Sequence, residues 1–144
     1  MRFTAKTTVA VAMLALCSLD SAYAQVRARA DISCKPAPQT LQYDCVVKLI
    51  DSGTNEPLSG LTLTVGADMP SMAGAHNVRP VAATEDSGKG TYRARIALEM
   101  RGNWALQLNL SGLTRDRVVK VLRFEDDLVG EAVPPQKPGS HRHN

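Results

Sequence analysis

Short runs of alternating apolar and polar residues, separated by turn-forming residues, are the feature that most constrains the fold of this chain. The alternation is clearest over residues 43–49, 61–65, 92–98 and 104–110. A period of two places every other side chain on the same face of a β-strand. Glycine, Asp, Asn and Ser are frequent between these runs and are typical of tight turns. After residue 25 no window carries a convincing helical stripe of apolar residues, so the pattern predicts an all-β domain.

Three further runs complete the predicted set of strands. Residues 28–34 and 78–84 are weaker, and the denser apolar run 117–124 suits a strand covered on both faces or a slightly irregular one. The total is about seven short antiparallel strands, which is typical of an immunoglobulin-like sandwich of two sheets. We therefore predict that residues 25–132 form such a sandwich, and that residues 133–144, which are rich in proline, form a disordered tail.

The first 24 residues have the organisation of a secretory signal peptide. Basic residues precede an apolar run of about 13 residues, which is shorter than the roughly 20 that a membrane-spanning helix needs. Ala22-Tyr23-Ala24 offers small residues where a signal peptidase would cut before Gln25. We predict a cleaved signal helix, a periplasmic or secreted protein, and no stable membrane span after cleavage. An uncleaved anchor and a lipoprotein modified on Cys17 are the alternatives.

Loss of the leader changes the meaning of the three cysteines. Cys17 leaves with it, and Cys34 and Cys45 remain as a pair. Exported compartments are oxidising, so two cysteines there most often form a disulfide. A thiol metal site or redox pair is the alternative, but the close C-x-x-C spacing is missing. We therefore predict a structural disulfide between Cys34 and Cys45.

Composition and motifs argue against two large classes of function. Lys and Arg number 17 against 14 Asp and Glu, and this balance is not that of a dedicated nucleic-acid binder. Aromatic residues make up only 4%, which argues against a base-stacking surface. His76 is the only histidine before the tail, and none of the common phosphate-binding or metalloprotease motifs occurs. We predict that the protein is not an enzyme and does not bind nucleic acid.

The stretch 67–76 is the most unusual part of the predicted domain. It lies between two predicted strands and contains Met69, Met72 and His76. Thioether sulfur is a soft neutral ligand that suits Cu(I), and imidazole also binds copper. Pro70 would stiffen this loop, and Gly74 would let it fold back. The spacing suits a metal site of two sulfur ligands and one nitrogen ligand, whereas the alternative is an apolar loop that covers the open end of the sandwich.

Three short elements together resemble the YtkA-like domain, which is related to FixH. They are Met-Pro-Ser-Met at 69–72 with His76 behind it, Gly-Thr-Tyr at 90–92, and Met-Arg-Gly-Asn-Trp at 100–104. The resemblance covers about half of the mature chain, residues 58–110, and implies an immunoglobulin-like sandwich. FixH-type members are associated with copper delivery to haem–copper oxidases. By this resemblance Met69, Met72 and His76 would carry copper. The chain departs from FixH in its cleavable leader, and its cysteine pair is not part of the shared motif.

These observations lead to one expected function and one alternative. We expect an exported metal-handling accessory protein that binds copper, as Cu(I), for trafficking, resistance or oxidase assembly, with an envelope metal-transport or oxidase-assembly protein as partner. The alternative is a metal-free sandwich module that docks on an envelope partner through the same loop. Tyr92 and Trp104 are expected in the core. Met100 would approach the loop if the sandwich brings both to one end, but core or turn packing is the preferred interpretation.

Overall fold

The computed structural model describes residues 26–132, and strands dominate this range. Its one helical element is the single 3-10 turn η1 (Pro70–Met72), which is far too short to cross a membrane. The predicted signal helix (1–24) and the predicted tail (133–144) lie outside the described residues.

Nine strands form in the described range, and each predicted run corresponds to at least one of them. In chain order they are β1 (Ala28–Pro36), β2 (Gln42–Asp51), β3 (Thr62–Asp68), β4 (Asn77–Ala82), β5 (Thr84–Glu85), β6 (Thr91–Ala97), β7 (Gly102–Ser111), β8 (Asp116–Phe124) and β9 (Val129–Glu131).

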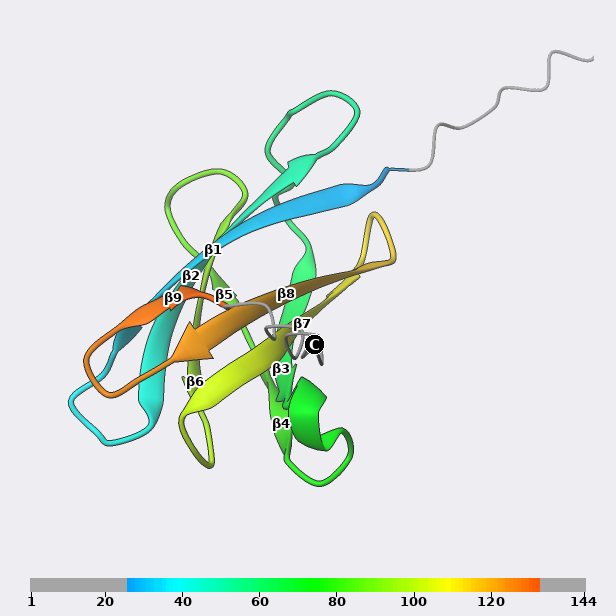
Figure 1. Cartoon of the computed structure of the whole chain (residues 1–144). Coiled ribbons are helices and arrows are strands. Elements are labelled where there is room, and N and C mark those ends of the chain that lie inside the picture. Colours follow the sequence, from blue (N-terminus) through cyan, green and yellow to red (C-terminus); the bar gives the residue numbers. More distant parts are fainter. Residues whose placement is uncertain (1–25, 133–144) are drawn as a thin grey trace, which may run out of the picture.

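The strands form two antiparallel sheets that pack as an open sandwich (Figure 1). One sheet has the order β1-β2-β6-β5 and the other the order β4-β3-β7-β8-β9. The first four strands of each order match the A-B-E-D and C′-C-F-G sheets of immunoglobulin domains, and β9 extends the second sheet. The predicted fold class, an immunoglobulin-like two-sheet sandwich, is confirmed.

The core lies between the sheets and consists of the apolar positions of the alternating runs. In the four clearest runs every apolar residue at the alternating positions is buried, whereas Val46, Ala97 and Ala105 occupy the intervening positions and are partly or fully exposed. Tyr92 and Trp104 are fully enclosed, as predicted, and the ring of Tyr43 meets that of Phe124 edge-on at 4.8 Å between centroids. Side chains at every second position of a strand share one face, so the sequence pattern determines which side of each sheet faces inward.

The run 78–84 was predicted as one strand, and the structure divides it. β4 pairs with β3 in the five-stranded sheet, whereas β5 pairs with β6 in the other sheet. The chain crosses between the sheets at Ala83, whose N–H donates to the carbonyl of Leu63 at 2.8 Å. β4 is an edge strand and therefore tolerates Pro80, which lacks the N–H that a central strand would need.

The run 117–124 also differs from its prediction. β8 pairs with β7 in unbroken register, so the strand is not irregular. Nor are both of its faces covered, because Val119 is 50% exposed and Val121 is 44% exposed on the outer side of the sheet. β9 was not predicted, since three residues are too few to establish an alternation.

The predicted disulfide is present and joins β1 to β2. Cys34 and Cys45 face each other in register, with an S–S distance of 2.02 Å and a Cα–Cα distance of 4.0 Å. The bridge therefore lies within one sheet, whereas the disulfide of antibody domains connects the two sheets. Both cysteines are buried and belong to the core.

Candidate functional site

The predicted metal loop connects β3 to β4 and folds back on itself. Pro70 is the first residue of η1, and Gly74 adopts a left-handed φ of 80°. The N–H of Met72 donates to the carbonyl of Met69 at 3.0 Å, and the N–H of Met69 donates to the carbonyl of His76 at 3.3 Å. The proline and the glycine thus play the roles that the sequence predicted, and the two ends of the loop are hydrogen-bonded to each other.

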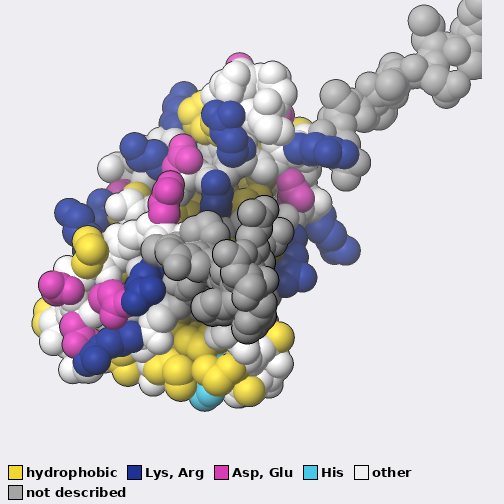
Figure 2. All heavy atoms as spheres, viewed as in Figure 1, with side chains coloured by type: hydrophobic (Ala, Val, Ile, Leu, Met, Phe, Trp, Pro, Cys, Tyr) yellow, Lys and Arg dark blue, Asp and Glu magenta, His cyan; other side chains and the backbone are white. Residues whose placement is uncertain are grey.

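Met69 and Met72 line one groove, of about 870 Å³, at this end of the sandwich. Met69 is only 4% exposed and belongs to the hydrophobic core, so this part of the loop also fills the end of the sandwich. Met72 is 39% exposed. Hydrophobic side chains gather around the histidine at this end of the molecule (Figure 2). One thioether of the loop is therefore deep in the protein, and the other is accessible from solvent.

Met100 is the residue that sequence reasoning underrated. It belongs to the turn 98–101 between β6 and β7 and lines the same groove as Met69 and Met72. Met100 also packs against the core, as the preferred interpretation of core or turn packing predicted. The sandwich nevertheless brings its turn to the loop as well. The sequence did contain a signal for Met100: only three of the five methionines follow residue 25, and Met100 is the one outside the loop.

His76 does not line the groove and instead pairs with the same turn. Its Nδ1 lies 2.5 Å from Oε2 of Glu99, the residue before Met100. A carboxylate only accepts hydrogen bonds, so the Nδ1–H of His76 donates, and in the neutral imidazole Nε2 keeps its lone pair. The imidazole is about one-quarter exposed. The structure therefore brings the two loop methionines together, while the histidine lies beside their groove.

Two arginines on the rim of the groove are neutralised by carboxylates. Arg101 binds Asp126 through two short contacts, and Arg123 binds Glu125 at 2.7 Å. The hydrogen bond that Arg101 donates to the Asp126 carboxylate raises the pKa of Arg101. Because each positive charge is paired, the rim opposes the approach of a cation less than two free guanidinium groups would.

Two buried side-chain oxygen atoms near the groove lack hydrogen-bond partners. The buried Oδ1 atoms of Asp68, at the end of β3, and of Asn103, near the start of β7, accept no hydrogen bond. Buried polar atoms are normally satisfied, so such a pair stands out. Asn103 lines the groove, although its Oδ1 atom is itself buried.

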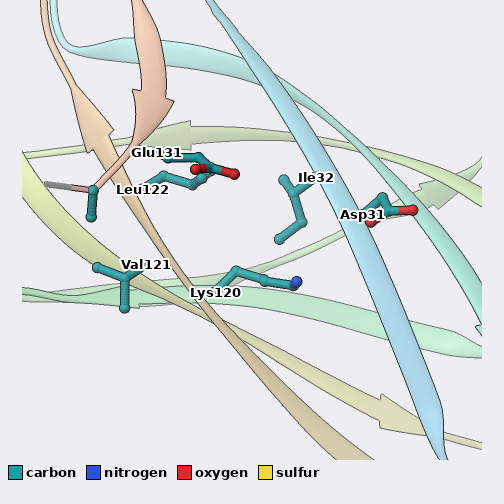
Figure 3. Close-up of a pocket in the computed structure, with 7 residues that line it drawn as sticks. Asp31, Ile32, Lys120, Val121, Leu122 and Glu131 are labelled. Atoms are coloured by element: carbon teal, nitrogen blue, oxygen red, sulfur yellow. The ribbon is translucent and has the colours of Figure 1, made fainter. Parts of the chain in front are cut away.

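A second hollow, of about 390 Å³, lies where β1 meets β8 and β9 (Figure 3). Ile32 of β1 faces Leu122 and Lys120 of β8 across it, with Glu131 of β9 nearby. It has no sulfur or imidazole in its lining. Within residues 26–132, no three His, Cys, Asp or Glu side chains cluster closely enough to hold a metal ion. The methionine groove is accordingly the candidate site.

Comparison with known proteins identifies one family. The YtkA-like family model matches residues 26–109, more than half of the 144-residue chain. The protein belongs to the YtkA-like family. The match contains the loop, the Gly90–Tyr92 element and the turn that carries Met100, and it ends within β7. No curated protein and no solved structure matches the chain.

Proposed function

We propose that this YtkA-like protein is an exported copper carrier, without enzymatic activity, that binds Cu(I) through Met69, Met72 and His76. One observation carries the proposal: the two loop thioethers line a single groove, and the loop's histidine is fixed beside it. Thioether and imidazole are both neutral ligands that suit copper. The donors present therefore fit the metal that the sequence suggested.

The arrangement also suits release of the ion. Neither a thioether nor a neutral imidazole needs to lose a proton to bind a metal, in contrast to a cysteine thiol. Cu(I) can therefore pass between sites by exchange of ligands alone. Met72 is exposed and can be approached by a partner, while the buried Met69 retains the ion from below. An envelope metal-transport or oxidase-assembly protein is the partner that such exchange would serve.

Glu99 supports the role of His76. Metal-binding histidines almost always donate their second ring N–H to a carboxylate, a backbone carbonyl or a water molecule, which selects the tautomer and orients the ring. The short contact between Nδ1 of His76 and Glu99 is of this kind and leaves Nε2 available to a metal.

The metal-free alternative is a docking module that uses the same loop. The exposed Met72 and the half-exposed Val121 beside the groove favour it, because exposed apolar groups at one place can mark a protein contact. The two functions differ in what they require of Met72. Copper binding needs its sulfur, whereas docking needs only its apolar surface.

The test is an anaerobic titration of the purified protein with Cu(I) against a competing chelator. The wild type should bind one ion more tightly than micromolar. Met69→Leu/Met72→Leu removes both sulfur atoms at nearly constant volume and should abolish tight binding without unfolding the domain. Val119→Ala, an exposed apolar position outside the groove lining, is the control and should bind as the wild type does. A wild type that binds no tighter than micromolar would refute the copper proposal and leave the docking module.

A further inference from the structure

We propose that Met100 is a third thioether ligand, so that the β6–β7 turn forms the second half of the metal site. This inference rests on the proposed function. Its basis is that Met69, Met72 and Met100 line the same groove although 28 residues separate the last two in sequence. All three methionines that follow residue 25 thus come together at one end of the sandwich.

The turn that carries Met100 is held firmly. The indole N–H of Trp104 donates to the carbonyl of Met100 at 3.1 Å, and the Trp104 ring is fully buried. Because a buried ring cannot move without disturbing the core, the backbone at Met100 is fixed relative to β7. A preorganised backbone lets the side chain present its sulfur at little entropic cost.

Met69 lies directly against the same turn. A Cβ added at Gly102 would stand 3.5 Å from the terminal methyl of Met69. Gly102 begins β7, two residues after Met100. The thioether at the bottom of the groove therefore reaches the segment that carries the third one. Glu99 of this turn also binds His76, so both ends of the loop contact it.

A third thioether would change the chemistry of the site. Three soft, neutral sulfur ligands favour Cu(I) over Cu(II) and over the divalent ions that prefer nitrogen and oxygen. Two thioethers leave a monovalent ion undercoordinated unless His76 also binds. With Met100, the groove can hold Cu(I) by three sulfur ligands, and Nε2 of His76 can complete the site while Nδ1 stays bound to Glu99.

The test combines affinity with a direct count of ligands. Met100→Leu should weaken Cu(I) binding at least about tenfold, the scale on which even supporting residues of metal sites act. Val119→Ala, an exposed apolar position on β8 but outside the groove lining, should bind as the wild type does. X-ray absorption of the copper-loaded wild type should show three sulfur neighbours, and that of Met100→Leu should show two.

The outcomes separate the two proposals. A wild type that does not bind Cu(I) tightly refutes the proposed function and this inference with it. A wild type that binds tightly, together with Met100→Leu of equal affinity, refutes this inference alone. If Met100→Leu fails to fold, the sulfur count of the wild type decides, and fewer than three sulfur neighbours overturns the assignment of Met100.

Discussion

Gly90→Ala should destabilise the domain far more than the same change at Gly60. Gly90 is the glycine of the Gly-x-Tyr element and adopts a φ of 66°, and Gly60 adopts a nearly equal φ of 71°. Left-handed backbone costs an L-residue with a Cβ about 1–2 kcal/mol, so both variants bear this cost. The pair therefore separates backbone strain from steric exclusion.

The additional cost at Gly90 follows from its surroundings. An added Cβ would stand 2.7 Å from the carbonyl oxygen of Leu49 and 3.0 Å from both the amide nitrogen of Leu58 and the Cβ of Pro57. Leu49 cannot shift freely, because its N–H donates to the Gly90 carbonyl at 2.8 Å and its carbonyl accepts from Leu58 at 3.0 Å. Forcing such packed groups apart costs about 1–3 kcal/mol. At Gly60 nothing lies within 4 Å of an added Cβ.

Thermal unfolding followed by circular dichroism measures the difference. We expect Gly90→Ala to lose about 2–5 kcal/mol in all and Gly60→Ala about 1–2 kcal/mol. For a domain of this size each kcal/mol lowers Tm by about 4–8 °C, so the two melting curves should be well separated. Equal Tm values for the two variants would refute the close approach of Gly90 to β2.

Three further predictions test the fold. Tyr92→Phe should lower the free energy of unfolding in urea by about 2–4 kcal/mol, because the Tyr92 hydroxyl makes hydrogen bonds to two backbone groups. Tyr43→Phe removes a single hydrogen bond to the backbone and should cost less. Equal losses for the two variants would contradict this. Cys34→Ala/Cys45→Ala should lower the free energy of unfolding by about 3 kcal/mol, and an unchanged urea midpoint would count against the bridge. Burial raises the pKa of Tyr43 and of Tyr92 above the usual value near 10. Above about pH 10 the unfolded chain therefore loses phenol protons that the folded protein keeps, and the free energy of unfolding should fall as pH rises. The double Phe variant should show a flatter alkaline profile.

The fold was predictable because both sheets have one inward face. A period of two distinguishes core from surface along each strand, and it located the buried residues of β2, β3, β6 and β7 correctly. It could not show that the chain changes sheets at Ala83, because this depends on β4 pairing with β3 and β5 pairing with β6, which the local sequence pattern does not indicate. Nor did it indicate that Val119 faces outward, because a dense apolar run carries no alternation.

The candidate site was predictable only as far as it is local. Met69, Met72 and His76 share one loop, so spacing alone placed them near one another. Met100 reaches the groove through the pairing of β7 with β3, a contact between segments distant in sequence. The partnership of His76 with Glu99 likewise depends on where the β6–β7 turn lies against the loop.

The most direct test of the copper proposal is the stoichiometry and affinity of Cu(I) binding by the purified protein under anaerobic conditions. The groove formed by Met69 and Met72 predicts one Cu(I) per chain with a Kd below micromolar, and loss of this binding in Met69→Leu/Met72→Leu. Absence of tight binding in the wild type would contradict the account, and so would a double variant that binds Cu(I) as tightly as the wild type does.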